Sequence, residues 1–478
     1  MEQMAGIDAK FLYSETRAAH MHTLKLVVLD CSGVPGGYEF DELVRILAGR
    51  LDGLPPFRRR VVPVPLGLGH PVWVEDPTFD ITRHVERRRL DPPAGDRELA
   101  ALVADVAERP LPRDRPLWQI VVAEGLPDQR LAVIAKIHHA LADGAATVAL
   151  LSKVLGGAEV TDGSAVERAP SSSWQPDALP SRRQLLALAA RAHATRARSL
   201  PSLAAQSARG LRASRVRRRS LLVKPPLPFD APRTSFNASL VAARTYAMAT
   251  LALDDLKAIR AEQGATLNDV YLAVCAGALR RYLTDRDELP TRSLVASVPV
   301  ATGPGADPLA GNHVDNLFVS IGTDIAEPLL RLRHIATATA GAKDVRSALG
   351  NDLLGRRAEV VPPQLYALSV RAWERSRLAN HLPPPLNLVL SNVPGPRQPL
   401  RFGPSVIEAL YSVGPILEGI GLNITAWSYV DAMYVSVLGS PSTVPDPWPL
   451  ADALAGSLSE LKAASGRAPG VEHSARAR

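Results

Sequence analysis

The stretch from His138 to Gly144 constrains the fold of this chain most, because it joins a predicted strand to a predicted helix. Leu131 to Ile137 is a short apolar run after the turn sequence Pro127 to Arg130, which predicts a largely buried strand. From Ala145 to Leu155 the apolar residues recur at helical spacing. The sequence therefore places two adjacent histidines and an Asp-Gly pair in a strand-loop-helix junction.

The two histidines of this junction are expected to differ in environment. Successive strand residues point to opposite faces, so one imidazole can face a cavity while the other packs beneath the strand. A His-His pair with Asp-Gly at a fixed offset arises by chance about once in a thousand times. Two alternatives remain open, a pair of core histidines capped by an Asp-Gly turn and a metal site. For a metal, Asp143 is the only nearby carboxylate and both cysteines are distant, so no metal is predicted.

The pattern His-His-x-x-x-Asp-Gly resembles the signature of the acyltransferase superfamily that contains chloramphenicol acetyltransferase, carnitine acyltransferases and peptide-synthetase condensation domains. Other stretches narrow the resemblance to the bacterial wax ester synthase/acyl-CoA:diacylglycerol acyltransferase family, from about residue 5 to about residue 462. These stretches are Pro116-Leu117-Trp118, Asn268-Asp269, Gly311-Asn312, Ser391 to Pro396, Pro415 to Gly419 and Gly421 to Ile424.

The resemblance implies a layered α/β (α+β) fold with two chloramphenicol-acetyltransferase-like domains and a tunnel at their interface. We expect an N-terminal domain over residues 1–160, a linker and basic helical crossover over 161–230, a C-terminal domain over 231–465 and a disordered tail over 466–478. Four strands are predicted to complete the sheet of the second domain: Leu386 to Ser391, Ala409 to Val413, Gly421 to Tyr429 and Ala432 to Leu438.

The expected reaction is esterification of diacylglycerol by acyl-CoA to triacylglycerol, with fatty alcohols giving wax esters. A neutral imidazole is suited to removing a hydroxyl proton near pH 7, and His139 is the candidate general base. A Gly-x-Ser-x-Gly nucleophile motif is absent from the sequence, which favours direct transfer without a covalent acyl-enzyme. Acyl-CoA is a co-substrate and no cofactor is expected. The alternatives are a carrier-protein-dependent condensation or polyketide-associated acyltransferase, and a non-catalytic lipid-binding protein of the same fold.

The resemblance also suggests roles for the remaining site residues. Asp143 is expected to shape the loop with an arginine partner, for which Arg58, Arg59 and Arg60 are candidates, and Gly144 to allow a tight turn or a close approach of acyl-CoA. For His138 we favour a buried packing role over a supporting hydrogen bond. Substrate contacts are expected from Asn268, whose alternative role is a helix N-cap, and from loops that contain Gly311, Asn312, Ser391, Asn392, Gly421 and Asn423. Arg113 and Gln119 lie in stretches that depart from the family pattern.

The location of the protein is predicted from its apolar runs and cysteines. None of the apolar runs reaches the ~18 residues that cross a bilayer, and residues 1–30 lack the apolar core of a signal peptide. The two cysteines are far apart, as is typical of a reducing compartment. We therefore expect a cytoplasmic protein whose membrane contact is peripheral.

A basic segment is the strongest charge feature of a chain whose net charge is only +7. Leu179 to Phe229 contains no acidic residue, and it predicts two helices, Arg182 to Arg198 and Arg209 to Arg219, interrupted near Pro201. Four arginines recur on one stripe of the second helix, namely Arg209, Arg212, Arg215 and Arg219. The segment is either a solvated helix between two domains or a contact for an anionic membrane or lipid droplet surface. Nucleic acid is not expected, because no aromatic residues are interleaved with the arginines and no pattern of a nucleic-acid-binding fold accompanies them.

Overall fold

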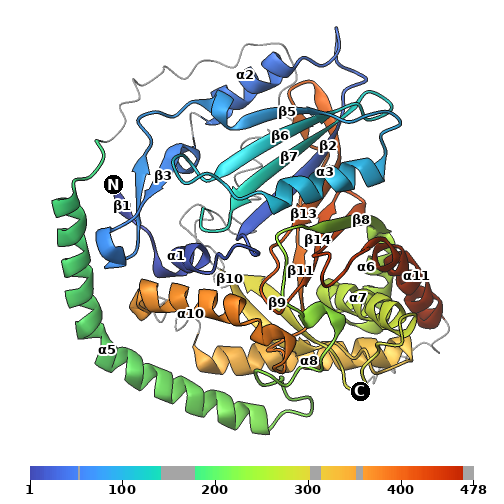
Figure 1. The fold of residues 1–478 in the computed structure, drawn as a ribbon. Coiled ribbons are helices and arrows are strands. Elements are labelled where there is room, and N and C mark those ends of the chain that lie inside the picture. Colours follow the sequence, from blue (N-terminus) through green and yellow to red (C-terminus); the bar gives the residue numbers. More distant parts are fainter. Residues whose placement is uncertain (52–53, 142–177, 302–313, 351–358, 467–478) are drawn as a thin grey trace, which may run out of the picture.

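The computed structural model describes residues 1–51, 54–141, 178–301, 314–350 and 359–466, which form two six-stranded sheets and one three-stranded sheet (Figure 1). The first large sheet consists of β12 (Arg401–Phe402), β13 (Ser405–Val413), β2 (His22–Asp30), β7 (Arg130–His138), β6 (Trp118–Glu124) and β5 (Val85–Arg89), in that order. The second consists of β10 (Val314–Ser320), β9 (Val295–Ala301), β11 (Leu388–Val393), β14 (Leu422–Tyr429), β15 (Ala432–Gly439) and β8 (Thr245–Ala252). The small sheet contains β1 (Glu2–Gln3), β4 (Val72–Glu75) and β3 (Arg59–Val62).

The first sheet is built around β2 and β7, which pair antiparallel from His22 opposite His138 to Asp30 opposite Arg130. Strand β7 contains the predicted strand Leu131 to Ile137, and it pairs antiparallel with β6 in a hairpin. Helix α3 (Asp96–Glu108) covers one face of this sheet and α2 (Phe40–Leu51) covers the other, because each buries a stripe of apolar residues at helical spacing.

Strand β13 corrects one sequence prediction. The run Ala409 to Val413 was expected in the second sheet, but β13 pairs antiparallel with β2 of the first, from Val406 opposite Asp30 to Val413 opposite Leu24. β2 is buried along almost its whole length, so it needs a hydrogen-bonded neighbour on both edges, and β13 supplies the second. The C-terminal half of the chain thus contributes strands to both sheets.

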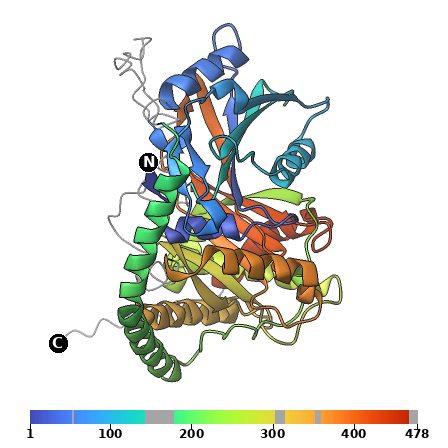
Figure 2. The ribbon, with the colours of Figure 1, turned by 60° about the vertical axis from the view of Figure 1, so that its left-hand side comes forward.

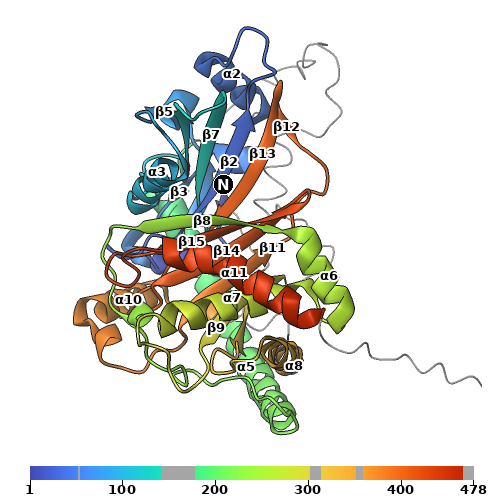
Figure 3. The ribbon, with the colours of Figure 1, turned by 90° about the vertical axis from the view of Figure 1, so that its right-hand side faces the viewer.

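Four helices cover the second sheet, as Figure 3 shows from the side. They are α6 (Leu253–Gln263), α7 (Leu267–Thr284), α8 (Pro328–Leu349) and α11 (Trp448–Ser465). Helix α7 is apolar on almost all sides and lies between α8 and α11 in the core. Trp427 and Tyr429 of β14 pack into the core of the first sheet, so the two sheets share a hydrophobic contact.

Helix α5 (Arg182–Arg219) corrects a second prediction, because it is a single helix of 38 residues that continues through Pro201. It runs along one side of the molecule past both large sheets (Figure 2). Leu185 and Ala189 pack on the small sheet, and Gly210 lies against the backbone of Leu349 in α8. Attachment at both ends offsets the roughly 3 kcal/mol that an internal proline costs a helix.

Helix α1 (Gly6–Tyr13) and helix α10 (Pro363–Ser376) connect the two halves of the chain. The Gly6 N–H donates to Glu359, Ser14 Oγ and the Tyr366 hydroxyl lie 3.1 Å apart, and the Ala18 N–H donates to Glu374 Oε1 at 3.0 Å. In the part of the chain that the structure describes, every helix is too short or too polar to cross a bilayer. The domain boundaries inferred from sequence stay a prediction.

Candidate active site

Strand β7 carries the two histidines to its C-terminal end, where they occupy different environments. The side chain of His138 is fully buried, whereas His139 follows the strand and is partly buried. The backbone N–H of His139 donates to the carbonyl of Met21 at 2.7 Å. Its ring stacks on Phe11 of α1, with ring centroids 4.1 Å apart and planes 12° from parallel. The strand end and α1 together fix the orientation of His139.

Both ring nitrogens of His138 have partners. The backbone N–H of Ala140 donates to Nδ1 at 3.0 Å, so Nδ1 carries no proton. Nε2 therefore carries the proton and donates it to Glu15 Oε1 at 3.0 Å. Burial, with the nearby positive charge of Arg113, holds the pKa of His138 well below its ordinary value. His138 is thus a neutral hydrogen-bonded support for the turn that follows the strand, which corrects the favoured expectation of simple packing.

Glu15 is the central acidic residue around His138. Its carboxylate forms an ion pair with Arg113 and lies 3.8 Å from Nε2 of His22, the residue that faces His138 on β2. Burial is the main reason why the pKa of His22 lies well below its ordinary value. Lys136 lies two residues before His138 on the same face of β7, and its Nζ donates to the carbonyls of Val106 and Arg109. Burial lowers the pKa of Lys136 to about 7.

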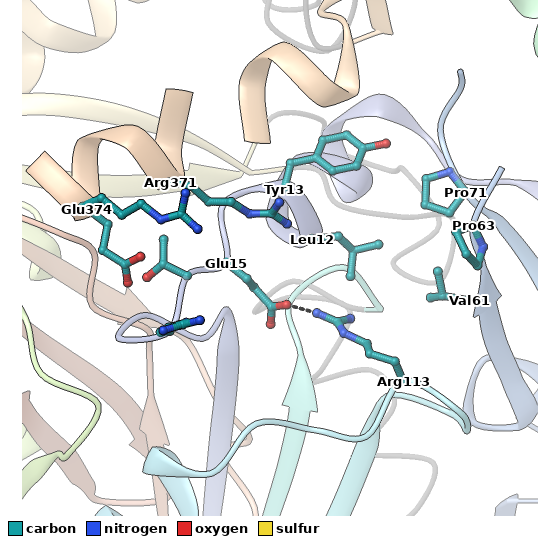
Figure 4. Close-up of a pocket in the computed structure, with 12 residues that line it drawn as sticks. Leu12, Tyr13, Glu15, Val61, Pro63, Pro71, Arg113, Arg371 and Glu374 are labelled. Carbon is teal, nitrogen blue, oxygen red and sulfur yellow. Dashed lines mark ion pairs between the residues drawn. The ribbon is translucent and has the colours of Figure 1, made fainter. Parts of the chain in front are cut away.

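A pocket of about 800 Å³ opens beside Glu15, between the two halves of the chain. In Figure 4, Glu15 faces Arg113, Arg371 and Glu374 of α10 lie on one side, and Val61, Pro63 and Pro71 lie on the other. The remaining residues that line the pocket are Leu12, Tyr13, Thr16, Arg17 and Arg375. Glu15 was not predicted from the sequence, and Arg113 was noted there only as part of a stretch that departs from the family pattern. The pair His20 and His22, at the start of β2 and just before it, was the signal in the sequence for a polar cluster here.

Several predicted site residues lie outside the described residues, namely Asp143, Gly144, Gly311 and Asn312. Arg60, one candidate partner of Asp143, lies 3.7 Å from the buried carboxylate of Asp76. Within the described ranges, no three His, Cys, Asp or Glu side chains gather in a way that would hold a metal ion.

Of the predicted substrate contacts in the C-terminal half of the chain, Ser391, Asn392 and Asn423 lie in strands, Gly421 directly precedes β14 and Asn268 lies in α7. Ser391 and Asn392 are partly buried in β11, opposite Thr425 and Ala426 of β14. Asn423 lies in β14, where its amide donates to the Pro415 carbonyl at 3.0 Å.

Gly421 packs so tightly that a Cβ atom would lie 2.5 Å from the side chain of Thr443. Asn268 is partly buried in the first turn of α7, and the N-cap of that helix is Thr266, which forms a capping box with Asp269. The alternative role of Asn268 as N-cap is therefore wrong. Whether any of these second-half residues contacts substrate stays a prediction.

The fold is that of the chloramphenicol-acetyltransferase-like acyltransferases. The structure superposes on the wax ester synthase/diacylglycerol acyltransferase from Marinobacter aquaeolei with a TM-score of 0.66 and 25% identity, over 97% of this chain and 100% of that one. It superposes on the first condensation domain of the calcium-dependent antibiotic synthetase with a TM-score of 0.57 and 17% identity, over 97% and 96% of the two chains.

The chain belongs to the wax ester synthase/diacylglycerol acyltransferase family, and it is an acyltransferase. The model of the catalytic domain of that family matches residues 4–271, and the model of its C-terminal domain matches residues 310–462. A Mycobacterium tuberculosis relative named a diacylglycerol O-acyltransferase is 39% identical over 98% of this chain and 97% of its own length. A second relative from the same organism and with the same activity in its name is 36% identical over 97% of this chain.

Proposed function

We propose that this protein transfers a fatty acyl group from acyl-CoA to the hydroxyl of diacylglycerol, which gives triacylglycerol and free CoA. Long-chain alcohols are the second acceptor class and give wax esters. Membership of the family and the activities in the names of its relatives support this assignment. The reaction uses acyl-CoA as a co-substrate and needs no resident cofactor.

His139 is the proposed general base of a direct transfer. It removes the proton of the acceptor hydroxyl as that oxygen attacks the thioester carbonyl carbon. A C–O bond forms, the tetrahedral intermediate collapses, and the C–S bond breaks. The imidazolium then returns the proton to the departing CoA thiolate, so no covalent acyl-enzyme is formed.

The hydrogen bonds of His138 are the reason for proposing His139, and not His138, as the general base. Both ring nitrogens of His138 are used, one by the Ala140 N–H and the other by Glu15, so His138 has no nitrogen with which to accept a substrate proton. His139 is partly buried at the end of the strand, and its orientation is fixed by Phe11. A base held in one orientation avoids the entropic cost of ordering it for each turnover.

The remaining residues of the motif and of the second half complete the proposal. Asp143 and Gly144 are the residues proposed to shape the turn after His139, with Asp143 in a structural role. The residues proposed to contact substrate from the C-terminal half of the chain are Asn268, Gly311, Asn312, Ser391, Asn392, Gly421 and Asn423.

Helix α5 is the proposed contact with an anionic membrane or lipid droplet, where diacylglycerol resides. Arg209, Arg212, Arg215 and Arg219 are exposed and form no ion pair with any residue that the structure describes. Such a stripe attracts anionic headgroups and would keep the protein peripheral to the membrane.

The test of this function is incubation of the purified protein with radiolabelled acyl-CoA and a panel of alcohols. The panel contains diacylglycerol, a long-chain alcohol and a carrier-protein-bound amine. We expect labelled triacylglycerol as the main product and wax ester as the second. Labelled amide from the carrier substrate, or binding of the acyl donor without any product, would overturn the assignment.

A further inference from the structure

The pocket beside Glu15 collects arginine side chains from both halves of the chain (Figure 4). Arg17 follows α1, Arg113 precedes β6, and Arg371 and Arg375 lie one helical turn apart on α10. Four arginines thus face two glutamates, Glu15 and Glu374, around one cavity. The cavity therefore has an excess of positive charge.

The partners of these groups show where that excess lies. Arg113 is neutralised by its ion pair with Glu15. Glu374 accepts the Ala18 N–H at 3.0 Å, and that hydrogen bond holds its carboxylate toward the chain segment after α1. Arg17, Arg371 and Arg375 are exposed, and none of the three forms an ion pair or hydrogen bond with a described residue. Three guanidinium groups are consequently available to an incoming anion.

The opposite wall of the pocket is apolar. Leu12, Val61, Pro63 and Pro71 line it, and in Figure 4 they lie across the cavity from Arg371 and Glu374. The volume of about 800 Å³ lies in the range of pockets that enclose small-molecule ligands. A ligand that fits this pocket has a strongly anionic part and an uncharged part.

We propose that this pocket binds the phosphate groups of a substrate, through Arg17, Arg371 and Arg375. The planar guanidinium group matches the geometry of phosphate oxygens and donates two parallel hydrogen bonds to them. The apolar wall receives the uncharged part of the same molecule. Because Glu15 lines the pocket and accepts a hydrogen bond from His138, the bound anion lies beside the strand end that carries His139. The inference rests on the proposed acyl transfer and identifies where its phosphorylated substrate is held.

Two kinds of ligand could bring phosphate groups to this pocket, namely CoA and a phospholipid headgroup. The test therefore has two arms. In the first, isothermal titration calorimetry measures binding of CoA and of pantetheine, which lacks the phosphates, to the full-length protein. Arg371→Gln and Arg375→Gln should each weaken CoA binding about tenfold and leave pantetheine binding unchanged. Arg260→Gln, which removes one exposed charge from α6, is the matched control and should change neither.

The second arm replaces CoA with a short-chain phosphatidic acid below its micelle concentration. If the two variants weaken only phosphatidic acid binding, the phosphate site stands and its ligand is a lipid. If they bind both ligands as tightly as the Arg260→Gln control does, the proposal is overturned. Both arms measure binding without turnover. They therefore test the phosphate site even if the protein forms no ester from acyl-CoA and the proposed function fails.

Discussion

Glu15 Oε1 accepts a hydrogen bond from Nε2 of His138 at 3.0 Å, across 123 residues of sequence. Because the other ring nitrogen of His138 accepts the Ala140 N–H, this contact ties the segment after α1 to the turn that contains His139. Arg113 compensates the charge of Glu15 from a third segment. Three segments of the N-terminal half that are distant in sequence thus meet at the end of β7. These contacts hold the two histidines of the motif in a fixed geometry.

Replacement of Glu15 tests this network. Glu15→Gln retains an oxygen that accepts the His138 hydrogen bond but removes the charge opposite Arg113, so the free energy of unfolding should fall by about 1–3 kcal/mol. The exposed Glu2, which pairs with Arg59, gives the matched control Glu2→Gln, expected to cost less than about 1 kcal/mol. Urea denaturation of both variants measures the difference. Equal losses in the two variants would show that Glu15 is an ordinary surface ion-pair residue.

The lowered pKa of Lys136 predicts a pH dependence of stability. Between the folded pKa of about 7 and the ordinary value of 10.5, the unfolded chain binds a proton at this lysine that the folded chain does not. This contribution to the free energy of unfolding therefore rises with pH across that window, by up to about 1.4 kcal/mol per pH unit. Lys136→Met should remove it, so wild-type and variant stabilities measured at pH 7, 8 and 9 should differ in slope. Parallel pH profiles would contradict the lowered pKa.

The arginine stripe of α5 predicts salt-sensitive membrane binding. Each basic residue close to an anionic surface contributes about 1 kcal/mol, so reversing Arg209, Arg212, Arg215 and Arg219 to Glu should remove most binding to phosphatidylserine vesicles at low salt. Co-sedimentation with and without phosphatidylserine measures it. Activity toward short-chain soluble acceptors should be retained, because the stripe is exposed and distant in sequence from the motif. Equal co-sedimentation of wild type and variant would leave α5 as a solvated helix between the two halves.

The paired reversal Lys257→Glu with Arg260→Glu on α6 controls for a general change in charge. It should bind the same vesicles as well as wild type does, whereas the double reversal of Arg212 and Arg215 should bind less. Both pairs change the net charge by the same amount, so a difference between them reports the location of the charge.

The local elements of this fold were predictable because their signals are local. The β6–β7 hairpin follows from two apolar runs around Pro127-Asp128, and α2 follows from Leu43, Leu47 and Leu51 at helical spacing. The family was also predictable, because its motifs are short and contiguous. The predicted strand Leu131 to Ile137 is found in the structure as part of β7, which ends at His138.

Long-range pairing was not predictable from periodicity. Nothing in Ala409 to Val413 indicates that its partner is β2, about 380 residues earlier, because an apolar strand fits either sheet equally well. Glu15 was missed for a similar reason, since its role depends on a contact with His138 that only the folded chain creates. The break predicted at Pro201 was wrong because tertiary packing at both ends of α5 overrides a local preference.

The most direct measurement of the central claim is the turnover number of His139→Ala for triacylglycerol formation from acyl-CoA and diacylglycerol. His139→Gln is a second variant, whose larger side chain retains more of the packing against Phe11 than Ala does. Thermal denaturation checks that both variants are folded. If His139 is the general base, kcat should fall at least about 10²-fold in both variants, while the acyl donor still binds. Folded His139→Ala protein with a kcat close to that of wild type would contradict the account.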